Sequence, residues 1–239
     1  MNTIHFVMMG KGGVGKSLIA VTLAQYLMDQ GHSLSCVDLD PTSPTFKQFS
    51  ALNVEHINIA DSECNIDPTR FDVLMEKIIS SENDWVVDTG APTFLPLVNY
   101  LAENEVFSFL VKSGRRVVIH SPLVGGVAMS ETVNGLKAIF LMSDCPVVIW
   151  ENEYFGPVEM NGKRFVQTTG YEQFKGRVLG MVLLEKWNHK TSEADLRTMH
   201  ARRLTWDEAI SDKNFMTMQR NRLTLMRRNI NEQLEMIEM

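Results

Sequence analysis

Eight consecutive residues near the start of the chain have the types and spacing that bind phosphate. The segment from Gly10 to Ser17 reads GKGGVGKS and matches the pattern G-x-x-x-x-G-K-[ST]. Its glycines let backbone N–H groups turn toward phosphate oxygens, because no Cβ stands in the way. Lys16 adds a cation for the β- and γ-phosphates, and the hydroxyl of Ser17 can bind Mg²⁺. The segment therefore predicts a P-loop that holds a nucleoside triphosphate with magnesium.

The same glycines also fit G-x-G-x-x-G, the weaker pattern of dinucleotide sites. Asp38 follows at roughly the spacing of an acid that binds a ribose. A dinucleotide site needs neither a phosphate-clamping lysine nor a magnesium hydroxyl, so Lys16 and Ser17 favour the triphosphate. The predicted nucleotide-binding residues of the loop are Gly10, Lys11, Gly12, Gly13, Val14, Gly15, Lys16, Ser17 and Leu18.

A second lysine, Lys11, stands at the start of the loop. With it, the segment KGGVGKS resembles the deviant Walker A motif of the ParA/MinD family of P-loop ATPases. The resemblance implies a weak, switch-type ATP hydrolase that uses ATP and Mg²⁺. It also implies a nucleotide-dependent homodimer in which Lys11 reaches the partner's nucleotide. From the residues alone, Lys11 is an extra cation beside the phosphates or a solvated lysine.

Two acidic segments extend this resemblance. Residues 37–41, VDLDP, resemble the D-x-D-P segment of the family, which implies that Asp40 positions the attacking water and that Asp38 supports the metal shell. Residues 86–91, VVDTGA, resemble its Walker B segment. An acid at the tip of a buried strand is costly unless it is paired or holds a cation, so Asp88 is predicted to hold Mg²⁺. Turn-forming aspartates and an ordinary strand-end aspartate remain the alternatives.

Three positions depart from the family pattern. Leu18 stands where the family often has Thr, Thr42 where many partition members have Gln, and Gly90 where Pro is common. These departures leave the finer phosphate contacts and the hydrolysis rate open. Asn152 follows a predicted strand, where many of these ATPases read the adenine edge, although a plain turn asparagine fits equally well.

Alternating apolar runs indicate the elements that must position these residues. Strands are expected at 4–9, 34–37, 84–88, 117–120, 146–150 and 177–184, and helices from the loop to near 31, at 71–80 and at 96–104. The order strand–helix–strand implies parallel pairing. We therefore expect an α/β fold of the P-loop NTPase (SIMIBI) class, a mainly parallel sheet with helices on both faces, in one domain over 1–239. An Asn-Gly pair suggests a hairpin excursion near 156–166.

Composition excludes several other classes of protein. The 239 residues are 44% apolar and 22% charged, with a net charge of -6 and no run long enough for a membrane span. No export signal is recognised, and Cys36, Cys64 and Cys145 are too far apart in the sequence for a disulfide framework, a zinc site or an iron–sulfur cluster. A cytoplasmic protein whose only metal is Mg²⁺ is expected.

The acidic charge belongs to the first half of the chain. Residues 1–110 hold 5 Lys/Arg against 14 Asp/Glu, whereas residues 111–239 hold 18 against 15. A basic helical region is predicted over 192–239, with a capping box at Thr205–Glu208 and an apolar stripe from Leu223 to Ile237. The basic stretch Arg202–Arg228 fits a closing helix with a solvated face, a surface for non-specific DNA, or, less readily, a membrane-surface helix.

Stretches outside the motifs resemble the TraL/StbB-like proteins of conjugative plasmids. They include ALNV at 51–54, LTWDEA at 204–209 and RLTLMRR at 222–228. The resemblance implies an accessory ATPase of plasmid conjugative transfer or stability, with a plasmid transfer or partition protein as its partner. A ParA-type partition ATPase is the first alternative. A metabolic P-loop kinase or ligase is the second, because its second-substrate site has no universal motif.

Overall fold

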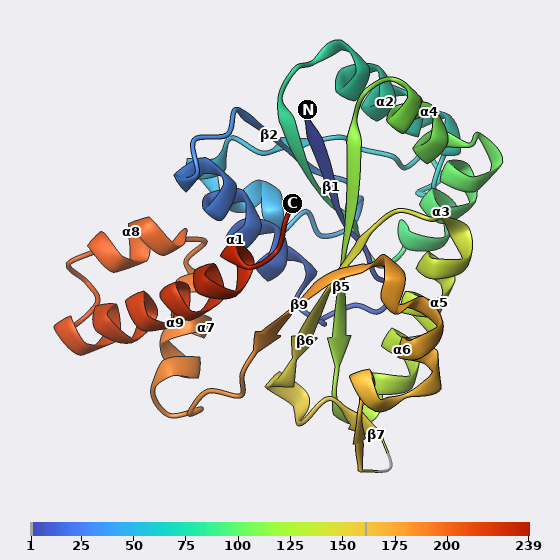
Figure 1. Cartoon of the computed structure of the whole chain (residues 1–239). Coiled ribbons are helices and arrows are strands. Elements are labelled where there is room, and N and C mark those ends of the chain that lie inside the picture. The colour runs from blue at the N-terminus through green and yellow to red at the C-terminus, as the bar shows by residue number, and fades with distance from the viewer. Residues whose placement is uncertain (1, 161) are drawn as a thin grey trace.

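A seven-stranded parallel sheet runs through the computed structural model, which describes residues 2–160 and 162–239 (Figure 1). The strands lie in the order β3-β2-β4-β1-β5-β6-β9, and every neighbouring pair is parallel. Their bounds are β1 Thr3–Val7, β2 Leu34–Asp38, β3 Glu55–His56, β4 Asp84–Asp88, β5 Arg116–Val124, β6 Val147–Asn152 and β9 Val178–Leu184. The predicted α/β class with a mainly parallel sheet is confirmed.

Helices cover both faces of this sheet (Figure 1). One face packs against α2 Phe71–Ser80, α3 Phe94–Glu103, α4 Val106–Lys112, α5 Met129–Met142 and α6 Thr169–Phe174. The other packs against α1 Lys16–Asp29, α7 Ser192–Ala201, α8 Trp206–Ser211 and α9 Thr217–Glu235. Each face buries its own apolar cluster, so the sheet is covered on both sides, as parallel sheets generally are.

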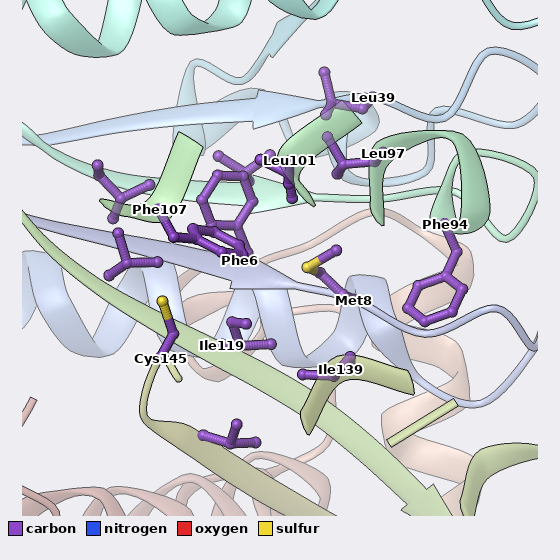
Figure 2. Close-up of a cluster of buried hydrophobic side chains, with 14 of the residues drawn as sticks. Phe6, Met8, Leu39, Phe94, Leu97, Leu101, Phe107, Ile119, Ile139 and Cys145 are labelled. Atoms are coloured by element: carbon purple, nitrogen blue, oxygen red, sulfur yellow. The ribbon is translucent and has the colours of Figure 1, made fainter. Parts of the chain in front are cut away.

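The strand before the phosphate loop shows how one segment supplies both clusters. Phe6 of β1 lies in the cluster drawn in Figure 2, where its ring meets the Phe107 ring edge-on at 5.9 Å between centroids. Val7, the next residue, lies in the opposite cluster. Successive side chains of a strand point to opposite faces, so a wholly apolar strand belongs at the centre of a two-sided core.

The sequence located most elements but missed three helices and the short edge strand β3. The bounds expected for α2 and β4 are those observed, and the strand expected at 117–120 continues to Val124 as β5. None of the helices α4, α5 and α6 was predicted. In α5, Gly135 interrupts the apolar pattern, and the structure gives the reason for a glycine there: a Cβ would lie 2.4 Å from the sulfur of Met9.

The predicted hairpin and the C-terminal helices are present. Strands β7 Glu159–Met160 and β8 Lys163–Arg164 pair antiparallel, while Asn161 of the predicted Asn-Gly turn lies outside the described residues. Thr205 and Glu208 form the predicted capping box at the start of α8. Among the residues that the structure describes, no helix is both long and apolar enough to cross a membrane.

Candidate functional site

The loop from Gly10 to Gly15 joins the end of β1 to the start of α1. Gly13 and Gly15 have φ values of 72° and 100°, which side chains rarely adopt, so glycine is needed at both positions. The first turn of α1 has neither a side-chain cap nor an acidic residue. Its free N–H groups and the positive end of the helix dipole therefore face the loop, and this arrangement attracts an anion such as phosphate.

Lys16 lies inside this loop. Its side chain is buried, and Nζ donates a 3.0 Å hydrogen bond to the backbone oxygen of Lys11. Burial lowers the pKa of Lys16, and the charges of Asp88 and Asp40 act in the opposite direction. The two carboxylates thus favour the charged form of the lysine, whereas burial favours the neutral form.

Ser17 and Asp88 meet at the carboxyl ends of the central strands. The hydroxyl of Ser17 donates a 2.6 Å hydrogen bond to Oδ2 of Asp88, while Oδ1 of Asp88 is buried and has no hydrogen-bond partner. Burial, and then the charge of Asp38, raise the pKa of Asp88 to about 7, while Ser17 and Lys16 oppose the rise. A buried carboxylate oxygen without a donor fits a cation site.

The position beside Ser17 and Asp88 offers a magnesium ion two protein oxygens. Across the described residues, no three His, Cys, Asp or Glu side chains gather closely enough to hold a metal ion. Mg²⁺ is commonly held by one or two protein oxygens together with nucleotide phosphates and waters, and Ser17 and Asp88 offer two such oxygens. The site as described would thus hold the ion only together with a nucleotide.

Asp38 and Asp40 have different surroundings. Asp38 is fully buried, and its two oxygens accept backbone N–H bonds from Asp40 at 2.9 Å and from Lys47 at 3.0 Å. Burial raises the pKa of Asp38 and these hydrogen bonds oppose the rise. Its contacts favour a role in holding the loop after β2, and its place in the metal shell stays a prediction. The Asp40 carboxylate lies against Gly90, on the neighbouring loop after β4.

Lys11 does not point at the other predicted residues of the site. Its Nζ lies 2.6 Å from Oε2 of Glu131, in the first turn of α5, and both side chains are about half exposed. Within this single chain the lysine is thus held at the rim of the loop, on the side of α5.

Asn152 closes the other side of the loop. Its Nδ2 donates to the backbone oxygen of Val14 at 3.2 Å, and its Oδ1 accepts from the backbone of Tyr154. Beside it lies a cavity of about 220 Å³. The lining residues include Gly15, Leu18, Asn152, Tyr154, Phe155, Lys186, Trp187, Arg197 and His200.

Most of the residues that line this cavity were not predicted from the sequence. Lys186 and Trp187 lie just after the end of β9, and ligands of parallel sheets bind at that edge. Their position directly after the last predicted strand was the signal that could have found them. A larger cavity of about 570 Å³, lined by Phe107, Met142 and others, lies at the amino ends of β5 and β6. It contains none of the predicted site residues.

The basic stretch Arg202–Arg228 lies apart from the loop, and three of its seven basic side chains form ion pairs with acids of other elements. Arg202 pairs with Asp212, Arg222 with the buried Asp195, and Arg227 with both Asp29 and Asp207. Within the described part of the chain, the ion pair of Arg228 is with Glu232, one turn along α9, and both side chains are well exposed. Much of the positive charge therefore joins α7, α8 and α9 to each other and to α1.

Comparison with known proteins shows similarity to ParA-type P-loop NTPases and to TraL. Residues 1–92 match the ParA family model, described as NUBPL iron-transfer P-loop NTPase. The chain is 40% identical over 237 residues to Protein TraL of Escherichia coli, with 98% of each chain covered.

Two solved structures share the fold. One is the MinD cell division protein of Aquifex aeolicus, with a TM-score of 0.55, 14% identity and 100% and 99% of the chains covered. The other is a putative plasmid partition protein from Borrelia burgdorferi B31 bound to AMPPNP, with a TM-score of 0.51, 17% identity and coverage of 98% and 99%.

Across the described residues, no cysteine belongs to a group of three or more side chains that could hold a metal ion, and Cys64 is exposed. Cys36 and Cys145 are buried, and burial raises the pKa of these two thiols to about 12 and about 11. Residues 1–92, which match this family model, include the loop from Gly10 to Ser17.

Proposed function

The chain belongs to the TraL family of ParA/MinD-type P-loop NTPases, and on this basis we propose that it binds ATP with Mg²⁺ and hydrolyses the nucleotide slowly. The observation that carries the proposal is the buried, partnerless Oδ1 of Asp88, beside Ser17 and the open amides of the loop. A carboxylate desolvated in this way is expected to be stabilised by a cation that arrives with the phosphates.

Each residue has a separate task in this mechanism. The loop amides and Lys16 bind the β- and γ-phosphates and offset the charge that builds up as the terminal phosphate leaves. Ser17 and Asp88 would hold Mg²⁺, which supplies further charge neutralisation when bound. Asp40 orients the attacking water, and the cavity beside Asn152 receives the base.

The proposal includes a nucleotide-dependent homodimer. Lys11 is half exposed at the rim of the site, so it can exchange Glu131 for the phosphates of a partner's nucleotide without unfolding any element. Light scattering of the Asp40→Ala protein with saturating ATP should give twice the monomer mass, whereas Lys11→Ala added to that variant should remain monomeric. Lys137→Ala, on the exposed side of α5, is the matched control, and a monomer in every sample would contradict the sandwich.

The biological role that we favour is an accessory, nucleotide-switched ATPase of plasmid conjugative transfer or stability. Identity of 40% along the whole chain to TraL supports it over the partition role, which rests on likeness of fold. Relaxase and secretion genes beside its gene would favour transfer, and a centromere-binding gene would favour partition. Phosphate transfer to a small molecule instead of water would favour a metabolic kinase or ligase.

Phosphate release by the purified chain tests the site. Lys16→Ala should abolish nucleotide binding, because the buried lysine supplies the cation of the loop. Asp40→Ala should keep binding and lose most hydrolysis. Equal rates in the wild type and both variants would disprove the site as assigned.

A further inference from the structure

Two positions that depart from the family pattern, Thr42 and Gly90, meet at the same carboxylate. Oδ1 of Asp40 accepts hydrogen bonds from the backbone N–H of Thr42 at 2.9 Å, from the Thr42 hydroxyl at 2.8 Å and from the backbone N–H of Ser43 at 3.0 Å. Three donors on one oxygen fix the rotation of the carboxylate. Among the described residues, no hydrogen bond is made to Oδ2.

Gly90 bounds the other side of the carboxylate. A Cβ at this position would lie 2.5 Å from Cγ and 2.7 Å from Oδ2 of Asp40, well inside van der Waals contact. Any other residue would push the carboxylate away, so the glycine is needed for the close approach. The two departures are therefore linked in space, although 48 positions separate them in the sequence.

The backbones around this contact are tied together. The Thr93 hydroxyl donates to the backbone oxygen of Leu39 at 3.0 Å, and the N–H of Leu39 donates to the backbone oxygen of Asp88 at 2.9 Å. The loops after β2 and β4 are thus joined, so the Asp40 carboxylate is set by the backbone of both loops as well as by the donors on its Oδ1.

We propose that Thr42 and Gly90 are positioning residues that together aim Oδ2 of Asp40 at the water that attacks ATP. The inference rests on the proposed ATPase function. In the reaction, the water oxygen bonds to the γ-phosphorus, and the bond from phosphorus to the β–γ bridging oxygen breaks with its electron pair on ADP. Oδ2 accepts a hydrogen bond from the water, whose protons end on the phosphate product and in solvent. Misaiming this acceptor by about 1 Å can cost up to about 100-fold in rate.

Thr42→Val tests the hydroxyl, because valine keeps the shape and leaves both backbone donors in place. We expect kcat for phosphate release to fall about tenfold, with the Kd of a fluorescent ATP analogue unchanged within about twofold. Thr42→Ser should restore the rate, since serine replaces the hydroxyl. Thr45→Val is the matched control, because its hydroxyl contacts the Ser43 backbone and not Asp40.

Gly90→Ala tests the contact of Gly90 with the Asp40 carboxylate. It should reduce kcat about as much as Asp40→Asn, again with nucleotide binding retained. The effects of substitutions that act through one group do not add, so Thr42→Val in the Asp40→Asn background should cause no further loss of kcat. A wild-type rate in Thr42→Val, or a full tenfold loss in the Asp40→Asn background, would overturn the inference. Absence of hydrolysis in the wild type would instead overturn the proposed function.

Discussion

The Ser17 hydroxyl donates a 2.6 Å hydrogen bond to Oδ2 of Asp88, a residue 71 positions away whose Oδ1 is buried and has no partner. The first helix of the fold is thereby joined to the strand that carries the proposed metal ligand. Two of the three residues that the sequence assigned to magnesium, Ser17 and Asp88, are thus in direct contact although they come from separate motifs.

Asp88→Asn should stabilise the nucleotide-free protein at pH 8, and it should abolish the strengthening of ATP binding by magnesium. Asparagine keeps an acceptor for Ser17 but removes a charge whose burial raises the carboxyl pKa to about 7. We expect a melting temperature a few degrees higher, corresponding to roughly 1–3 kcal/mol. Mg²⁺ should no longer strengthen ATP binding by calorimetry. A magnesium effect of wild-type size would place the ion elsewhere.

Trp187 should report occupancy of the cavity beside Asn152. The indole lines this cavity with Tyr154, so a base that enters it should quench the tryptophan emission. Trp187→Leu should weaken ATP binding by about tenfold, a loss of about 1.4 kcal/mol of stacking and contact area. Inorganic triphosphate, which has no base, should bind wild type and variant equally. Weaker triphosphate binding by the variant would mean that the loop itself is disturbed.

The free energy of unfolding should fall as the pH drops below about 6.5, because of two histidines buried together. Nδ1 of His5 lies 3.0 Å from Nε2 of His120, and the Trp150 indole donates to the other His120 nitrogen at 3.1 Å. Burial lowers the pKa of His5 to about 3 and that of His120 well below its ordinary value. Protons therefore bind the unfolded chain more readily, and stability is lost as the pH falls.

Urea unfolding between pH 7.5 and 5 measures this loss. His120→Gln keeps an acceptor for Trp150. It should reduce the slope of the free energy of unfolding against pH by about 1.4 kcal/mol per pH unit, which is the slope that one titrating proton contributes. His189→Gln, at an exposed position, should keep the wild-type slope. An unchanged slope in His120→Gln would show that this histidine does not titrate between the two states.

Arg227 and Arg228 are neighbours on α9, but we expect different effects of removing them. Arg227 is largely buried between Asp29 and Asp207, so Arg227→Ala should cost about 1–2 kcal/mol of stability through lost ion pairs and packing. Arg228→Ala should leave the melting temperature unchanged, because its side chain is mostly exposed.

If the C-terminal region contacts DNA, the exposed Arg228 and not the largely buried Arg227 should make the contact. Titration of a DNA duplex at several salt concentrations should then give a slope that is smaller by about one for Arg228→Ala. Salt-dependent binding that survives neutralisation of both Arg227 and Arg228 would exclude α9 as the DNA surface.

The nucleotide loop and most of the sheet could be located from the amino-acid sequence without any structure. The residues from Gly10 to Ser17 are contiguous, and their requirements are local: glycine where φ is positive, a strand before and a helix after. Six of the seven strands were equally recognisable, because buried parallel strands are unbroken apolar runs, whereas the two-residue edge strand β3 was missed. The helix α5 was not predicted because Gly135, which is required by its contact with Met9, interrupts the apolar pattern of the helix.

How the side chains of the site meet depends instead on the three-dimensional arrangement of the strands. Strand β4 lies between β2 and β1, and this order places Asp88 beside Ser17 and Gly90 against Asp40. The fold also places Lys11 beside Glu131 and pairs Arg202, Arg222 and Arg227, three of the basic residues that composition had suggested for a partner, with acids of the chain itself. Local propensity acts over a few residues, whereas these contacts depend on which strands become neighbours, and that order is set by packing along the whole chain.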